Sequence, residues 1–498
     1  MKDIKSKLIS AEQASKLIKN NSRLGILTVG PRSYPAELCK ALERRFVSEG
    51  RPKGIEVIFN LSYGEEKGEG IDRFGHQGMV KRFIGSDYSF SPRISRLISK
   101  NSVQAYCFPS SVISEMFSAG AHNKPGVISK LGIGSFVDPR LQGGRLNPCS
   151  EEGLVEHLVF REEEWLFFKN HPLDAVILKA EAMDEEGNLL FYSPAAKSEA
   201  ANLASAARKN GGLVIAEVKR IVERVRWEMS LPAFLFDYYV LAKDESKRRD
   251  KIKSSQLLNL SQEWEIIAGR VTKEIEEENK VFLSKRLRAM LPKIASSGKK
   301  FKIIADWFDP WEAEGELGEE ERNIVFLDYL PHFCDTGLLD LAIVPFNQID
   351  GSGNVNSSKK GHKIIGCNHL LEVCQNSKKV IFCGTFTPNG YSLNLQEGEL
   401  RIIKDGRLTS FVPQVEQITF SSEQAFKYGQ EVMYITERAV FSLHDESLVL
   451  LEIAPGVNLW QDVIQKMECE VIISPQLKLM DFSLFVKKKD LGQLSQIG

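Results

Sequence analysis

Several features that would point to particular classes of protein are missing from this sequence. Its 8 cysteines are scattered and contain no Cys-x-x-Cys pair, so a disulfide framework is not indicated and a reducing cytoplasm is the expected location. No apolar run is long enough to span a bilayer, and residues 1–13 lack the apolar core of a secretory signal. Neither Gly-x-Ser-x-Gly nor His-Glu-x-x-His occurs, which excludes two common hydrolase motifs.

The sequence also lacks an excess of charge of either sign. Its net charge is -1, from 65 basic and 66 acidic residues, so neither nucleic acid nor a membrane is expected as a partner. With 43% hydrophobic and 26% charged residues, the composition is that of an ordinary globular protein. A chain of 498 residues exceeds what one hydrophobic core usually serves, so two or more domains are expected.

An internal repeat is the clearest organising feature. Asp174-Ala-Val-Ile recurs as Asp340-Leu-Ala-Ile, 166 positions later. At the same offset Asp184-Glu-Glu-Gly-Asn recurs as Asp350-Gly-Ser-Gly-Asn, and the stretch 210–215 recurs at 376–381. Each copy predicts a buried strand, an Asp-x-x-Gly-Asn turn, a helix and a second buried strand. Strands that alternate with helices favour mainly parallel sheets, so the predicted fold is two related open α/β domains.

The boundary between the two predicted domains lies in a charged stretch. Residues 244–261 are rich in charge and serine without hydrophobic periodicity, as is typical of a linker. The predicted domains are therefore 1–243 and 262–498. Apolar residues at helical spacing predict a helix that opens the second domain: Trp264, Ile267, Ala268, Val271 and Ile275.

Ordered motifs over more than 400 residues resemble one known family. The blocks are 10–20, 76–98, 131–147, 184–190, Asp340-Leu341, Gly353–Asn356, Gly384–Thr387, 434–443, 451–467 and 477–481. This set is similar to the family I, or glutamate-nucleophile, CoA-transferases, which include acetate and propionate CoA-transferases. The resemblance implies an N-terminal and a C-terminal α/β domain with the active site between them, and a homo-oligomer. It also implies that coenzyme A is a substrate, with no covalently bound cofactor.

The residue that acts as nucleophile in the family has no counterpart at the matching position. The family's glutamate precedes a proline at a strand end; aligned on Pro310, its position holds Trp307. No glutamate occurs between Glu278 and Glu312. Asp306 is adjacent but would point to the opposite face of a strand, and Asp309 lies two residues beyond Trp307. Asp306 and Asp309 are the candidate catalytic residues.

The glycine-rich loops of the family are also changed. Its Gly-x-Gly-x-Pro, Asp-Gly-Gly-Gly and Gly-x-Gly-Gly-Phe loops correspond here to 284–288, 335–338 and 366–370, and its first N-terminal loop to 27–32. Glycine lets a backbone N–H approach the ligand where a side chain would block it. The resemblance therefore implies substrate or CoA contacts at Gly337, Gly366, Asn368 and Gly384.

Three further groups of residues contain side chains that could form a site. His362, Cys367, His369 and Cys374 are zinc-ligand types, but their spacing matches no known finger pattern, so no metal site is predicted. The acidic run 312–321 is interpreted as solvated surface. Lys285, Arg286 and Arg288 could bind CoA phosphates, although a solvated helix face explains them more simply.

Three functions remain open at this point. The first is transfer of CoA between an acyl-CoA and a short-chain carboxylate, impaired by Trp307. The second is a catalytically silent member of the family that binds ligands or supports assembly. The third is acyl-CoA thioester hydrolysis, in which Asp306 or Asp309 activates water.

Overall fold

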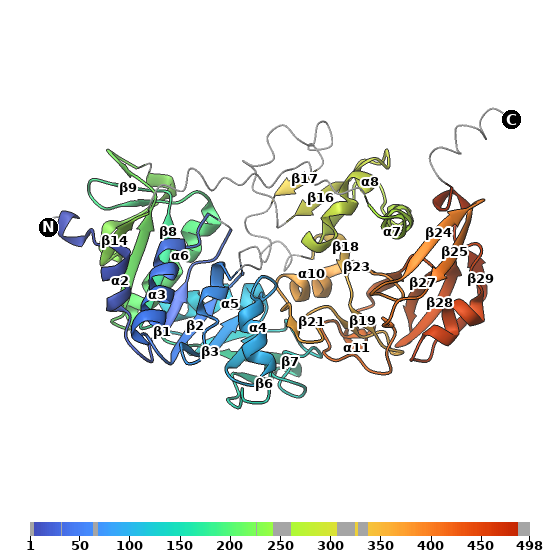
Figure 1. Cartoon of the computed structure of the whole chain (residues 1–498), viewed down its shortest axis with the longest axis horizontal. Coiled ribbons are helices and arrows are strands. Elements are labelled where there is room, and N and C mark those ends of the chain that lie inside the picture. Colours follow the sequence, from blue (N-terminus) through green and yellow to red (C-terminus); the bar gives the residue numbers. More distant parts are fainter. Residues whose placement is uncertain are drawn as a thin grey trace. The chain divides into compact units, whose positions relative to one another are not determined.

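The computed structural model describes residues 4–30, 32–62, 68–225, 227–242, 260–305, 324–326 and 337–486. The chain forms two compact units, coloured along the sequence in Figure 1. Unit 1 comprises Met1–Asp250 and Ser358–Glu372, and unit 2 comprises Lys251–Ser357 and Val373–Gly498. Residues 358–372 thus lie within the predicted second domain in sequence but pack with unit 1. The predicted linker falls mainly on residues outside the described ranges.

Unit 1 is built, in its described residues, on a seven-stranded sheet whose neighbouring strands are all parallel. Near-continuous runs of buried apolar residues form these strands, as expected where helices cover both faces. In spatial order the strands are β14 (Tyr238–Leu241), β11 (Leu213–Val218), β8 (Ala175–Ala180), β1 (Arg23–Ile26), β2 (Ile55–Phe59), β3 (Val80–Gly85) and β4 (Gln104–Cys107).

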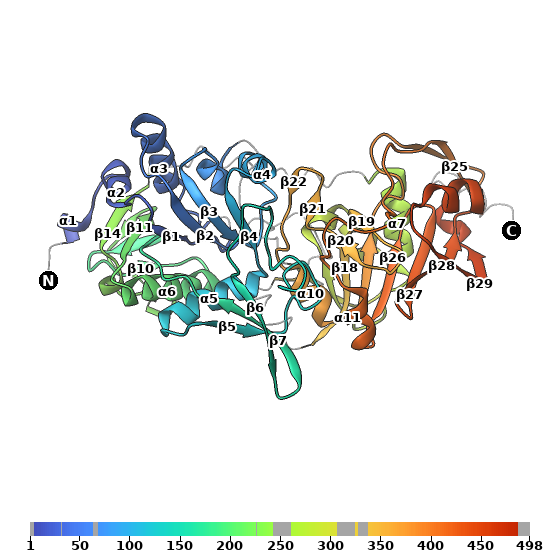
Figure 2. The ribbon, with the colours of Figure 1, turned by 90° about the horizontal axis from the view of Figure 1, so that it is seen from below.

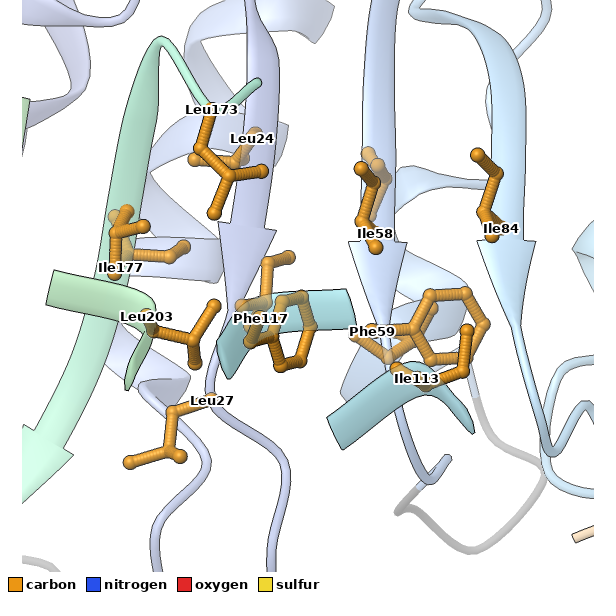
Figure 3. Packing of buried hydrophobic residues seen from close by; sticks show 14 of the residues in the cluster. Leu24, Leu27, Ile58, Phe59, Ile84, Ile113, Phe117, Leu173, Ile177 and Leu203 are labelled. Atoms are coloured by element: carbon orange, nitrogen blue, oxygen red, sulfur yellow. The ribbon is translucent and has the colours of Figure 1, made fainter. Parts of the chain in front are cut away.

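Helices cover both faces of this sheet, as Figure 2 shows. One face carries α2 (Ala11–Leu17), α3 (Ala36–Glu49) and α4 (Pro92–Ser99), and the other carries α5 (Ser110–Ala121) and α6 (Pro194–Lys209). Figure 3 shows Ile113 and Phe117 of α5 and Leu203 of α6 lying against the apolar side chains of the strands. Because these three side chains are at most 3% exposed, they tie both helices to the sheet.

Smaller elements surround the main sheet of unit 1. A three-stranded antiparallel sheet contains β5 (Gly126–Ser129), β7 (Glu163–Lys169) and β6 (Val155–Phe160). A second small sheet contains β12 (Ile221–Val222), β9 (Ala182–Asp184), β10 (Leu189–Leu190) and β13 (Ser230–Leu231). Residues 358–372 add the hairpin of β21 (Lys359–Lys360) and β22 (Lys363–Ile364) and the start of α10 (Leu370–Asn376).

Unit 2 contains a mixed sheet, nine strands wide in the described part of the chain. Its first six strands are parallel: β17 (Ile324–Phe326), β16 (Lys302–Ala305), β15 (Lys280–Leu283), β18 (Leu339–Pro345), β23 (Ser377–Cys383) and β26 (Glu431–Ile435). Then β27 (Ala439–His444) and β28 (Ser447–Ile453) are each antiparallel to the preceding strand, and β29 (Ile472–Leu479) is parallel to β28.

The helix predicted to open the second domain is confirmed as α7 (Gln262–Thr272), on which Ile267, Ala268 and Val271 are buried. The other helical segments of unit 2 include η6 (Lys285–Met290), α8 (Leu291–Ala295), part of α10, and α11 (Ser422–Lys427). Two antiparallel pairs complete the unit: β19 (Gln348–Ile349) with β20 (Val355–Asn356), and β24 (Ser392–Gln396) with β25 (Glu399–Lys404). No helix in the described ranges is long and apolar enough to cross a membrane.

The sequence repeat is confirmed at the level of single hydrogen bonds. Asp184 Oδ1 accepts the backbone N–H of Asn188 at 2.8 Å, and Asp350 Oδ1 accepts that of Asn354 at 3.0 Å. Tyrosine hydroxyls then donate to the turn glycines: Tyr239 Oη to the Gly187 carbonyl at 2.8 Å, and Tyr434 Oη to the Gly353 carbonyl at 2.6 Å. The strands also occupy matching positions in the two sheets. In unit 1, β8 lies next to β1, and in unit 2, β18 lies next to β15.

The starting residues of the two repeats are also equivalent. Asp174 Oδ2 accepts the backbone N–H of Arg23 at 2.9 Å, and Asp340 Oδ2 accepts that of Lys280 at 2.9 Å. Each aspartate therefore fixes the start of the neighbouring parallel strand, β1 in unit 1 and β15 in unit 2.

The turn of the first repeat gives a stability prediction. Asp184→Ala should lower the free energy of unfolding by about 2 kcal/mol, because a buried carboxylate that accepts two backbone N–H groups and the Asn188 amide is lost. The neighbouring exposed Glu185→Ala should change it by less than about 0.5 kcal/mol. Urea titrations followed by tryptophan fluorescence would measure both, and equal effects would contradict the role given to the turn.

Candidate functional site

A buried polar network lies at the carboxyl ends of the parallel strands of unit 1. Asn60 follows β2 directly and is its centre. Its Oδ1 accepts hydrogen bonds from the hydroxyls of Ser110 (2.7 Å) and Ser86 (2.9 Å). Its Nδ2 donates to Ser114 Oγ at 2.9 Å, and its backbone N–H donates to Thr28 Oγ1 at 3.0 Å. Because the carboxyl ends of parallel strands are where α/β proteins bind ligands, this network is a candidate site.

Glu199 extends the network from α6. Its Oε2 accepts the hydroxyl of Ser114 at 2.5 Å, while Oε1 has no hydrogen-bond partner among the described residues. Burial raises the pKa of this carboxyl to about 7, and the hydrogen bond from Ser114 offsets only part of that effect. Glu199 can therefore hold or release a proton near neutral pH.

The predicted substrate residues Gly366 and Asn368 lie against this network. Asn368 N–H donates to the Ser86 carbonyl at 2.8 Å, and its own carbonyl accepts the N–H of Ser110 at 3.2 Å. Gly366 has φ +88°, and a Cβ there would come within 2.4 Å of the Ser86 carbonyl oxygen. Only glycine fits at this position, because any side chain would collide with the backbone of Ser86. A role for Gly366 and Asn368 toward CoA stays a prediction.

Two further contacts hold residues 366–372 on unit 1. Glu372 Oε1 accepts the backbone N–H of Ser111 at 2.8 Å and its hydroxyl at 3.1 Å, so the carboxylate caps the first turn of α5. Burial raises the pKa of Glu372. Cys367 Sγ lies 3.4 Å from Cys107 Sγ, and both thiols are buried. No group of three metal-ligating side chains occurs among the described residues.

In unit 2, a buried ion-pair cluster holds the Gly384–Thr387 block. Phe386 N–H donates to Glu437 Oε2 at 2.9 Å, and the guanidinium of Arg438 lies 5.0 Å from the centre of the Phe386 ring. Arg438 is 1% exposed and also donates to Glu437 Oε1 (2.9 Å) and Thr387 Oγ1 (3.2 Å). A Cβ on Gly384 would come within 2.7 Å of the Phe346 ring, so packing explains this glycine.

The remaining predicted residues of unit 2 are placed as follows. Gly337 is exposed, two residues before β18 begins. Arg286 and Arg288 lie exposed on η6, which follows β15, and Arg286 donates to the Ser357 carbonyl (3.1 Å) and to Asn347 Oδ1 (3.0 Å). Asp306, Trp307, Asp309 and the acidic run 312–321 lie outside the described residues. The strand before them, β16, ends at Ala305.

Sequence reasoning missed Asn60, Ser110, Glu199 and Glu372. A signal existed for Asn60, because a polar residue directly after the apolar run Ile55–Phe59 marks the carboxyl end of a buried strand. Glu199 stands among alanines on α6, where a helical wheel places it on the buried face. Ser111 and Glu372 are 261 positions apart, so only the fold reveals their contact.

The titration of Glu199 gives a pH prediction. The folded-state pKa of about 7 lies above the ordinary value of 4.5, so the unfolded chain binds fewer protons between these values. The contribution of Glu199 to stability should therefore fall by about 3 kcal/mol as the pH rises through this window, and stay level above it. Glu199→Gln should remove this fall, whereas the exposed control Glu185→Gln should keep it. Urea titrations between pH 4.5 and 8 measure the difference, and parallel curves for wild type and Glu199→Gln would contradict the prediction.

Comparisons with known proteins agree with the sequence motifs. The profile of the Coenzyme A transferase family matches residues 9–240. The chain is 31% identical over 515 residues to acetate CoA-transferase YdiF of Escherichia coli O157:H7, in a match that covers 96% of this chain and 95% of that protein. It is 30% identical over 517 residues to caffeate CoA-transferase of Acetobacterium woodii, in a match that covers 97% of this chain and 98% of that protein.

Solved structures give the same result for the fold. The structure of the acyl-CoA transferase YdiF from E. coli O157:H7, in a thioester complex with CoA, matches with a TM-score of 0.86 at 30% identity and covers 96% of each chain. The structure of a RipA mutant matches with a TM-score of 0.55 at 14% identity over 99% of this chain and 97% of that chain, which concerns the fold alone. The predicted α/β fold with mainly parallel sheets is thereby confirmed, and the chain belongs to the CoA-transferase family.

Proposed function

We propose that this protein binds acyl-CoA thioesters but transfers CoA to short-chain carboxylates only slowly, because it lacks the family's nucleophilic glutamate. Support for the ligand comes from family membership and from relatives that include an acetate and a caffeate CoA-transferase. The observation that carries the proposal is the absence of any glutamate between Glu278 and Glu312, the stretch that contains β16 and its carboxyl end.

The transfer reaction explains why this absence matters. An enzyme carboxylate attacks the thioester carbonyl carbon, the C–S bond breaks, and CoA leaves as a thiolate while an acyl–enzyme anhydride forms. The thiolate then attacks the enzyme's carbonyl carbon, which releases the first carboxylate and leaves a glutamyl-CoA thioester. A second carboxylate reverses these steps. Because an indole ring has no carboxylate oxygen, Trp307 cannot form either intermediate.

Two opposing effects act on ligand binding in the proposed site. A tryptophan side chain at the position where the family has glutamate would fill space next to the reacting carbon and hinder the acyl group. The cationic side chains of η6, which include Arg286 and Arg288, attract the phosphates of CoA in a salt-dependent way. Together, the attraction of the phosphates and the hindrance of the acyl group lead to a protein that binds CoA but turns over little acyl-CoA. The catalytically silent alternative, a member of the family that binds ligands or supports assembly, differs from the proposal in having no turnover.

Thioester hydrolysis is the second candidate function, and one observation favours it. In the sequence, Asp306 directly follows Ala305, the last described residue of β16. An aspartate there could take a proton from water as the water oxygen attacks the thioester carbon, which yields a carboxylic acid and the CoA thiol. Asp309 is the other carboxylate of this short stretch before Pro310.

The first test of the proposal concerns the covalent intermediate. Wild-type protein incubated with acetyl-CoA should gain no CoA-sized mass by intact mass spectrometry, yet should bind acetyl-CoA in isothermal titration. Trp307→Glu should restore a carboxylate, form the adduct on residue 307, and raise acetate-dependent transfer by one or more powers of ten. Trp307→Gln opens the same space without a carboxylate and is the matched control. A CoA adduct on wild-type protein, or transfer at the rate of an ordinary family member, would refute the proposal.

The second test separates slow transfer from hydrolysis. Release of free CoA thiol from acetyl-CoA is followed with and without acetate. A hydrolase releases thiol without acetate and loses that activity on Asp306→Asn or Asp309→Asn, whereas slow transfer needs the acceptor. We expect thiol release without acetate to stay at the level of a buffer blank.

A further inference from the structure

A groove with a volume of about 490 Å³ lies on unit 1, and its lining residues are different from those of the buried polar network. One wall is the exposed side of α4, with Arg96, Ser99 and the following Lys100. The other wall is the turn and second strand of the β21–β22 hairpin, with His362 and Lys363. Figure 2 shows this hairpin beside α4. We call this cavity the basic groove.

The two segments that form the basic groove carry no acidic residue over a long distance. No Asp or Glu occurs between Asp87 and Glu115, or between Asp350 and Glu372. The chain as a whole contains 66 acidic and 65 basic residues, so these two segments differ from the average composition. Two segments far apart in sequence thus bring positive charge to one cavity. A cavity lined by one sign of charge concentrates ions of the opposite sign.

Arg96 of α4 and Lys100, which follows its last residue, place two positive charges on one side of the groove. Arg96 and Lys100 stand four positions apart, where like-charged side chains of a helix repel each other. Arg93 of the same helix differs, because it donates to Glu43 Oε1 at 2.9 Å. The described residues provide no carboxylate within ion-pair distance of Arg96 or Lys100. An anion in the groove would remove this repulsion.

Hydrogen bonds fix the two walls to each other. Ser99 Oγ donates to the backbone carbonyl of His362 at 2.9 Å, which joins the end of α4 to the hairpin turn. At the other end, Ser89 Oγ donates to the backbone carbonyl of Ile365 at 3.4 Å, which joins the residues before α4 to the segment after the hairpin. The walls are therefore held in place before any ligand binds, which lowers the entropic cost of binding.

We propose that the basic groove binds a phosphate ester of nucleotide size. Its volume falls in the range of small-molecule sites and exceeds what a single phosphate ion needs. Arginine forms paired hydrogen bonds with phosphate oxygens, and lysine adds point charges. The ligand is a free nucleotide, distinct from the CoA whose phosphates the side chains of η6 attract. The inference does not depend on the proposed function, because no transfer residue takes part in it.

The experiment uses the full chain and three probes: ADP, inorganic pyrophosphate and CoA. Isothermal titration should show that wild-type protein binds ADP and pyrophosphate, and more weakly when the salt concentration is raised. Arg96→Gln/Lys100→Gln should weaken ADP binding about tenfold or more, and Lys363→Gln on the opposite wall should also weaken it. The control Arg44→Gln/Lys19→Gln makes the same change of charge at exposed residues of unit 1 outside the groove and should leave affinity unchanged.

The CoA titration tests whether the groove is separate from the site of CoA. If the groove variants weaken ADP binding and leave CoA binding unchanged, the groove is a nucleotide site of its own. Equal weakening of ADP and CoA binding would overturn this. Absence of ADP and pyrophosphate binding by wild-type protein, or equal losses in groove and control variants, would overturn it. Melting temperatures show whether each variant folds, and Lys363→Gln tests the groove independently of α4.

Discussion

The fold of both units depends on one repeated arrangement, a buried aspartate that bonds the backbone and side chain of an asparagine four residues later. In unit 1 Asp184 binds Asn188, and in unit 2 Asp350 binds Asn354. Each asparagine also holds a neighbouring segment in place through its side-chain oxygen. Asn188 Oδ1 accepts the backbone N–H of Ala233, and Asn354 Oδ1 accepts that of Ser422. The turn therefore determines where the chain leaves the central strand and how it meets the layer beside it.

This arrangement also explains which parts of the fold could be predicted from the sequence. Asp184, Asn188 and their counterparts bond within a few residues, so the motif and its repetition are visible in the sequence alone. The buried strands were predictable for the same reason, because both faces of a parallel strand are apolar. The packing of residues 358–372 on unit 1 was not predictable. It depends on contacts such as Asn368 with Ser86 and Glu372 with Ser111, which no local pattern encodes.

The candidate site was predicted only in part. Family motifs indicated Gly366 and Asn368, and the fold places both against the polar network around Asn60. The glycines at 366 and 384 have packing reasons of their own, so a glycine in a family motif does not by itself identify a ligand contact. Glu199 was not predicted from the sequence. Its raised pKa is caused by complete burial, which depends on the tertiary structure. Asp306, Trp307 and Asp309 remain sequence-based predictions.

The return of residues 358–372 to unit 1 affects how the protein could be divided. A gene split at the charged stretch near residue 250 would place this segment on the second fragment, although it completes the first. The first fragment alone would expose the Ser86 carbonyl, the N–H groups of Ser110 and Ser111, and the Cys107 thiol, all now covered by residues 366–372. A split at that point would therefore leave the first fragment without the segment that covers these groups.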